Sequence, residues 1–212
     1  MERRPLASRK THLANLAAGF LAKNKISPNH ISLLSVVFSL LALIFYTKSN
    51  DKSFYLFLAA LCIQLRLICN LLDGMVAIEY NKKSIYGNLF NDIPDRFADV
   101  FIILGAGFYS YHNENTTSFG FHLAWVNAIL AVITAYIRVL GVSLGTPMFF
   151  SGIMAKPQRM AIITISSLLA LIPHLTIPFI SIALVIMFIG QCLTITKRIK
   201  LIAMDLQQKA VK

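Results

Sequence analysis

The residues of this sequence that are best suited to chemistry are four aspartates in an otherwise very apolar chain. They are Asp73, Asp92, Asp95 and Asp99, and they make up four of the nine acidic residues. Asn70 and Asn91 add amide oxygens to the same stretch. Hard oxygen ligands of this kind select Mg²⁺ or Mn²⁺, and a carboxylate at the edge of a bilayer is costly and usually functional. The stretch therefore predicts a site for divalent cations, one or two in number, and for a phosphate group.

The spacing of these residues places them on two helical faces. Positions 66, 70, 73 and 77 share one face of a helix, and positions 91, 95 and 99 share one face of the next. Because only the short turn 79–86 joins the two helices, we expect antiparallel neighbours whose faces form one cleft. Gly74 and Ala77 leave space beside Asp73, and Gly87 permits a tight entry into the second helix. The alternative is that the carboxylates are solvated helix ends that pair with nearby lysines and arginines.

The elements that must hold these residues are membrane helices. The chain has 212 residues, of which 57% are hydrophobic and 14% charged, whereas an ordinary soluble domain has about 25% charged residues. This composition predicts an all-α integral membrane protein with six transmembrane helices. The expected spans are 31–47, 54–78, 88–110, 121–142, 158–172 and 179–195.

The segment before the first span has a basic start and apolar residues at helical spacing between positions 13 and 21. This pattern favours an amphipathic interfacial helix over a signal peptide, which is the alternative. We therefore expect three segments. They are a cytoplasmic or interfacial helix in residues 1–26, a six-helix domain in 27–196 and a basic cytoplasmic tail in 197–212.

The distribution of basic residues predicts the orientation. Six spans place both termini on one side, and most lysines and arginines fall there, whereas the opposite side carries Lys48 and Lys52. Because positive loops mark the cytoplasm, both termini and the aspartate stretch are expected to be cytoplasmic. The same distribution accounts for the net charge of +11. Membrane lipids, rather than nucleic acid, are therefore the expected partners of the basic residues.

Four basic residues near the predicted cleft are candidates for binding a phosphate on the acceptor substrate. They are Arg66, Arg138, Lys156 and Arg159. Arg66 lies one turn deeper than Asn70, and Arg138 lies late in the fourth span, where a guanidinium without a partner is costly. Lys156 and Arg159 flank the start of the fifth span, and positive-inside topology alone explains them equally well.

The spacing within residues 70–95 resembles the signature of the CDP-alcohol phosphatidyltransferase family, D-x2-D-G-x2-A-R-x8-G-x3-D-x3-D. In this chain the pattern is Asn70-x2-Asp73-Gly74-x2-Ala77-Ile78-x8-Gly87-x3-Asn91-x3-Asp95. All the spacings agree, and six spans behind an amphipathic helix also agree with the family. A motif of this length in this context points to a mechanism.

The resemblance implies a membrane transferase of phospholipid synthesis. It would move a phosphatidyl group from a CDP-linked lipid such as CDP-diacylglycerol to an alcohol and release CMP. By position, Asp73 would be a metal ligand and Asp95 both a ligand and the catalytic base, with Asn70 and Asn91 at the two other metal-ligand positions. The nucleotide cleft would be lined by Gly74, Ala77 and Gly87. A homodimer is implied as well, and the form of the motif resembles bacterial members, which suggests a bacterial inner membrane.

Three positions depart from the family pattern. Asn70 and Asn91 replace aspartates and Ile78 replaces an arginine, while Asp92 and Asp99 can restore charge as additional metal ligands. The departures leave open the alternative that the protein is a catalytically degenerate relative, which binds the nucleotide-lipid. A small membrane transporter is a weaker alternative, because its charges would lie at the midplane of several helices, whereas these gather at one edge of two.

Overall fold

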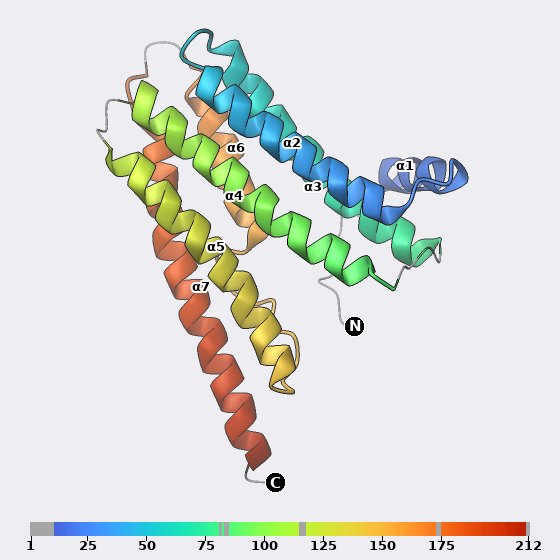
Figure 1. Ribbon diagram of the computed structural model, residues 1–212. Coiled ribbons are helices and arrows are strands. Elements are labelled where there is room, and N and C mark those ends of the chain that lie inside the picture. Colours follow the sequence, from blue (N-terminus) through green and yellow to red (C-terminus); the bar gives the residue numbers. More distant parts are fainter. Residues whose placement is uncertain (1–10, 81, 83–84, 115–117, 173–174, 211–212) are drawn as a thin grey trace.

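The computed structural model of the protein describes residues 11–80, 82, 85–114, 118–172 and 175–210. These ranges contain seven α-helices and no β-strand (Figure 1), which confirms the all-α prediction. The helices are α1 (His12–Lys23), α2 (Pro28–Lys48), α3 (Phe54–Glu79), α4 (Gly87–Asn113), α5 (Phe119–Ser143), α6 (Lys156–Leu169) and α7 (Phe179–Ala210). Residues 1–10 of the predicted interfacial segment and residues 211–212 of the predicted tail lie outside the described ranges.

The helix boundaries follow local sequence signals, with two departures from the predicted spans. Pro28 stands in the first turn of α2, and the Ser27 hydroxyl oxygen accepts a hydrogen bond from the His30 N–H at 3.3 Å. α6 has 14 residues and ends three residues before the predicted end of its span. α7 continues for 15 residues beyond the predicted end at 195, so the described part of the basic tail is helical.

The helix order in space differs from the packing expected for α3 and α4. The two helices run in opposite directions, but each packs mainly against α2 and they make few direct contacts with one another (Figure 1). One reason is the close approach of α4 to α2, where a Cβ on Gly105 would lie 3.0 Å from the Leu43 Cα. The expectation that the two helices pack directly is therefore wrong, but their predicted faces do meet, through side-chain contacts such as the hydrogen bond from Asn70 to Asp95.

The remaining helices close the space beside α3 and α4. α5 packs against α4 and α7, while α6 packs against α3 and α7. α1 rests on α3 through Ala14, Ala18 and Ala22, which are buried, and leaves Leu13 and Phe20 exposed. This amphipathic pattern agrees with the helix predicted before the first span.

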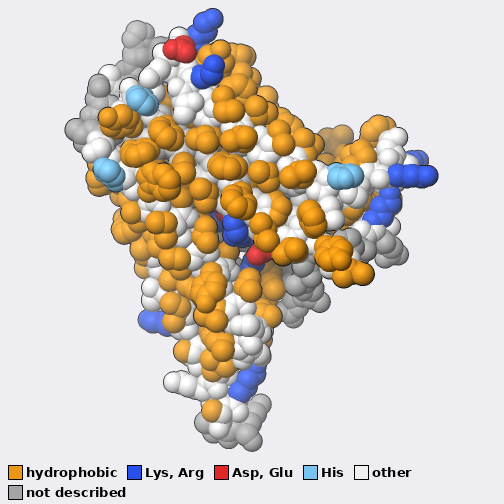
Figure 2. All heavy atoms as spheres, viewed as in Figure 1, with side chains coloured by type: hydrophobic (Ala, Val, Ile, Leu, Met, Phe, Trp, Pro, Cys, Tyr) orange, Lys and Arg blue, Asp and Glu red, His pale blue; other side chains and the backbone are white. Residues whose placement is uncertain are grey.

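The outer surface is that of an integral membrane protein. Four helices, α2, α3, α5 and α7, are long and apolar enough to cross a bilayer. Large apolar side chains cover most of the face in Figure 2, and a small group of basic and acidic side chains interrupts them near its centre. Such an apolar outer surface is expected where lipid, not water, surrounds the helices.

Candidate active site

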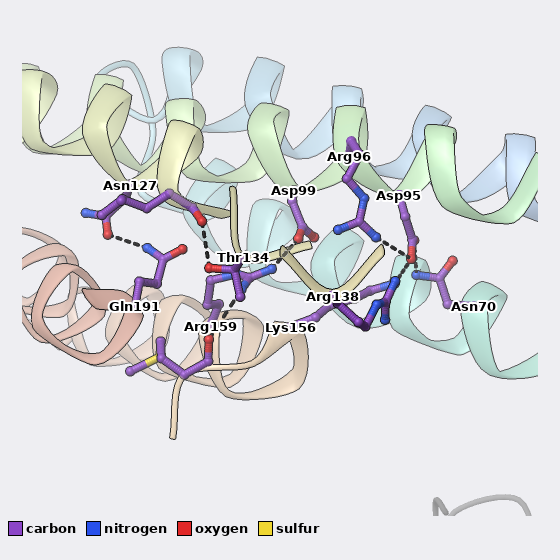
Figure 3. Close-up of polar contacts among 12 residues, drawn as sticks. Asn70, Asp95, Arg96, Asp99, Asn127, Thr134, Arg138, Lys156, Arg159 and Gln191 are labelled. Carbon is purple, nitrogen blue, oxygen red and sulfur yellow. Dashed lines mark hydrogen bonds and ion pairs between the residues drawn. The ribbon is translucent and has the colours of Figure 1, made fainter. Parts of the chain in front are cut away.

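Asp95 on α4 is the centre of the polar contacts at this end of the bundle (Figure 3). The Asn70 amide of α3 donates a hydrogen bond to Asp95 Oδ1 at 2.9 Å, and the Lys156 Nζ of α6 donates to Asp95 Oδ2 at 2.5 Å. Arg66 Nη2 lies 3.5 Å from Asp95 Oδ1. Asp95 is buried, so these contacts replace the water that a carboxylate otherwise binds. Side chains of α3 and α6, two helices distant in sequence, thus hold one carboxylate of α4.

Asp73 on α3 is held from a different direction. Its side chain is 3% exposed, and the Ser32 hydroxyl of α2 donates a hydrogen bond to Oδ2 at 2.6 Å. The other oxygen, Oδ1, accepts no side-chain hydrogen bond from the described residues. The spacing of residues on α3 does not predict this contact, because Ser32 lies on a different helix.

Asp99 forms the most deeply buried ion-pair group of the described chain. Arg66 Nη2 donates to Asp99 Oδ1 and Arg159 Nη2 donates to Asp99 Oδ2, both at 2.5 Å. All three side chains are at most 2% exposed. Because the three residues lie on α4, α3 and α6, the group ties these helices together. A role of Asp99 as an extra metal ligand stays a prediction, and its two oxygens already bind guanidinium groups.

Asp92 lies on the side of α4 that faces α5. Arg138 Nη2 of α5 is 3.0 Å from Asp92 Oδ1, and Arg96 Nη2 is 3.3 Å from the same oxygen. Arg138 also stacks over the Phe150 ring, with 5.6 Å between the guanidinium carbon and the ring centroid. The carboxylate of Asp92 on α4 therefore balances the charge of the deep arginine on α5.

The other predicted residues lie along the same two helices. Gly74 is buried beside Asp73, and Ala77 follows one turn later on α3. Gly87 is the first residue of α4, and Asn91 lies one turn before Asp95 and is half-buried. Their roles as nucleotide and metal contacts stay predictions.

A cavity of about 450 Å³ opens beside Asp95. Its wall includes Asn70, Thr134 and five basic side chains, and Asp95 is the only carboxylate among its described lining residues. The basic side chains are Arg96, Arg138, Lys156, Arg159 and Arg198. A concave space with this excess of positive charge is suited to a ligand that carries a phosphate.

Two basic residues of this wall, Arg96 and Arg198, are not among the predicted site residues, and the sequence predicts Arg198 in the cytoplasmic tail. Arg198 is buried, and its guanidinium donates to the Thr134 carbonyl at 2.7 Å and to the Ser151 carbonyl at 3.0 Å. One signal could have revealed it. Gln191, Thr194 and Arg198 recur at helical spacing and form a polar stripe that faces the bundle.

Comparisons with known proteins agree with this fold and show the family. A model of the CDP-alcohol phosphatidyltransferase family matches residues 25–196, and the chain belongs to this family, as its motif predicted. It is accordingly a membrane phosphotransferase of phospholipid synthesis.

Two relatives and two solved structures illustrate the similarity. The chain is 28% identical over 182 residues to an uncharacterized protein of Aquifex aeolicus, with 85% of this chain and 84% of that one covered. It is 25% identical over 188 residues to the phosphatidylinositol phosphate synthase of Streptomyces avermitilis, with 86% and 74% covered. The phosphatidylinositol phosphate synthase of Mycobacterium tuberculosis with CDP-DAG bound shares the fold, with a TM-score of 0.77, 16% identity and 91% and 94% coverage. The same enzyme with manganese and citrate gives a TM-score of 0.77, 17% identity and 89% and 88% coverage.

The motif residues offer oxygen donors of the kind that a divalent cation binds. Asp73 offers a buried oxygen, Oδ1, that accepts no side-chain hydrogen bond from the described residues. Asp95 is buried as well, and each of its oxygens already accepts a hydrogen bond, from Asn70 and from Lys156. Within the described ranges, no three aspartate, glutamate, histidine or cysteine side chains converge in a group that could hold a metal.

Proposed function

We propose that this protein transfers a phosphatidyl group from CDP-diacylglycerol to the hydroxyl of an acceptor that itself carries a phosphate, with release of CMP. The observation that carries the proposal is the position of the motif carboxylate Asp95 at the wall of a cavity with five basic side chains. The name of one relative, a phosphatidylinositol phosphate synthase, agrees with such an acceptor. Glycerol 3-phosphate and inositol phosphate are the first candidates.

In this reaction Asp95 is the base. The acceptor hydroxyl oxygen forms a bond to the phosphorus that carries the diacylglycerol, its proton passes to Asp95, and the bond from that phosphorus to CMP breaks. Asn70 and Lys156 hold the carboxylate in one orientation through the hydrogen bonds at 2.9 and 2.5 Å. A fixed base next to the acceptor removes the cost of orienting the two groups during the reaction.

The donor lies on the other side of Asp95, along the motif. Gly74, Ala77 and Gly87 would line the space for the nucleotide. Asp73, with the carbonyl oxygens of Asn70 and Asn91, would hold Mg²⁺ or Mn²⁺. The bound cation would neutralise the charge of the donor pyrophosphate. Ser32 fixes the Asp73 carboxylate for this role through its bond to Oδ2.

The membrane arrangement that accompanies this function has six spans. α2, α3, α5 and α7 meet the length and hydropathy of a span, and α4 and α6 lie among them as the other two. Positive loops then place both termini and the site at the cytoplasmic face of a bacterial inner membrane, where CDP-lipids and phosphorylated alcohols meet. α1 would lie in the interface through its exposed Leu13 and Phe20, and the protein would form a homodimer.

The test is CMP release by the purified protein in liposomes, with CDP-diacylglycerol, Mg²⁺ or Mn²⁺, and a panel of acceptors. We expect turnover with a phosphorylated alcohol such as glycerol 3-phosphate or inositol phosphate, and little with serine, glycerol or inositol. Turnover with an uncharged alcohol, and with no phosphorylated one, would contradict the proposal that the acceptor carries a phosphate. Metal-dependent binding of CDP-diacylglycerol without any turnover would favour the catalytically degenerate relative.

Arg138→Gln is expected to weaken the binding of the phosphorylated acceptor but not the binding of the donor. Loss of a hydrogen bond to a charged group costs about 1.5–3 kcal/mol, which corresponds to a KM roughly 10- to 100-fold higher. The KM for CDP-diacylglycerol should stay within about twofold of the wild-type value, because the donor binds elsewhere. The measurement is steady-state CMP release with each substrate varied in turn.

The matched control is Lys200→Gln, which removes one positive charge from an exposed position of α7 on the same side of the protein. It should leave both KM values unchanged. Equal increases of KM for donor and acceptor in Arg138→Gln would show that Arg138 supports the fold or the donor site instead.

A further inference from the structure

We propose that the ammonium group of Lys156 takes the place of one of two divalent cations, so that the site binds a single cation, next to Asp73. The proposal deepens the proposed function and rests on it for the meaning of the site. The number of bound ions, however, can be measured without turnover. Three features of the site support one cation: the charge of the motif, the contacts of Lys156 and the contrast between the two aspartates.

The negative charge of the motif is enough to balance one divalent cation. Buried charges are stable only when they are balanced by partners of opposite sign. A motif with four aspartates balances two divalent cations, whereas Asn70 and Asn91 leave only Asp73 and Asp95 at the four positions. An amide oxygen can still coordinate a cation, but it contributes no negative charge. The loss of two charges therefore removes the balance for one ion.

The contacts of Lys156 place a permanent cation at the second position. Its Nζ lies 2.5 Å from Asp95 Oδ2, and the Asn70 amide occupies Oδ1 of the same carboxylate at 2.9 Å. A divalent cation that approached Asp95 Oδ2 would meet the positive charge of Lys156 within hydrogen-bond distance of the same oxygen, so the ammonium opposes a metal ion there. A lysine ammonium is a compact point charge, more like a bound metal ion than the broad guanidinium of arginine is.

The position of Lys156 in its helix makes the pairing with Asp95 necessary. It is the first residue of α6, and a cation at a helix N-terminus opposes the helix dipole. Its side chain is only 24% exposed, so water compensates little of that cost. The carboxylate of Asp95 supplies the compensation, and Pro157 fixes the start of the helix that presents the lysine.

Asp73 shows the opposite pattern. It is as buried as Asp95, but among the described side chains the neutral hydroxyl of Ser32 is the group that donates to it, on Oδ2. Oδ1 accepts no side-chain hydrogen bond from the described residues. Of the two motif carboxylates, Asp73 therefore lacks a cationic partner in direct contact, and Asp95 already has one. The single cation belongs next to Asp73.

The test is a count of Mn²⁺ ions per chain by electron paramagnetic resonance titration of the full-length protein in detergent with added lipid. We expect one tightly bound Mn²⁺ in the wild type and one in Lys156→Arg, which keeps the positive charge. The triple variant Asn70→Asp, Asn91→Asp, Lys156→Gln restores four carboxylates and removes the ammonium. It should bind two Mn²⁺ ions and show the dipolar broadening of a close pair.

Two bound ions or none in the wild type would overturn the proposal, whatever the behaviour of the variants. A triple variant that elutes as a single species and binds only one ion would overturn it as well. A wild type that releases no CMP would contradict the proposed function but not the ion count. One bound Mn²⁺ in a protein without turnover would still support the proposal that the Lys156 ammonium takes the place of a second metal ion.

Discussion

Asp95→Asn is expected to lower kcat for CMP release roughly 10²- to 10⁴-fold, the range that general acid–base catalysis supplies. Asparagine has nearly the same shape as aspartate but cannot accept the proton of the acceptor hydroxyl. It also removes the negative charge that Lys156 faces at 2.5 Å, so the ammonium loses its partner. The KM values should change much less, because Asp95 acts on the reacting proton.

The measurement is the initial rate of CMP release at saturating donor and acceptor. Asp51→Asn is the matched control, since Asp51 is an exposed aspartate in the turn between α2 and α3 and far from Asp95 in the sequence. Its rate should equal that of the wild type. If Asp95→Asn retained more than about a tenth of the wild-type kcat, another group would have to be the base.

Asp99→Ala is expected to have the largest effect on stability, with a loss of about 3–5 kcal/mol, the cost of leaving buried charges without their partner. The variant exposes two guanidinium groups, of Arg66 and Arg159, to an apolar interior. Both are at most 2% exposed, so water cannot replace the carboxylate. α3, α4 and α6 would lose the group that ties them together next to the cavity.

Thermal unfolding of the purified variant in detergent checks this expectation, with yield of folded protein as a second readout. The control is Asp205→Ala, which removes one partner of the pair between Asp205 and Lys209 on α7. Half of the Lys209 side chain is exposed, and a pair of this kind contributes at most about 1 kcal/mol. A melting temperature of Asp99→Ala equal to that of the control would contradict the structural role assigned to Asp99.

The amino-acid sequence by itself determined the class of fold, the helices and the family. Runs of apolar residues predicted all the described helices from α2 onward, because helices in a membrane must satisfy their own backbone hydrogen bonds and cover themselves with apolar side chains. Ser27 and Pro28 predicted the start of α2 for a purely local reason, the capping of free backbone amides. The spacing from Asn70 to Asp95 predicted the family, because the motif lies within one pair of consecutive helices.

Only the tertiary structure decided which groups contact the aspartates. Lys156 reaches Asp95 across 61 positions, and Ser32 reaches Asp73 across 41. Arg198 was assigned to a tail, and α3 was expected to pack on α4, whereas α2 packs against both. Helical spacing shows which residues share a face but not which helix that face meets. The partners of Asp73, Asp95 and Asp99 therefore depend on the packing of helices distant in sequence, and that packing decides what each carboxylate can bind.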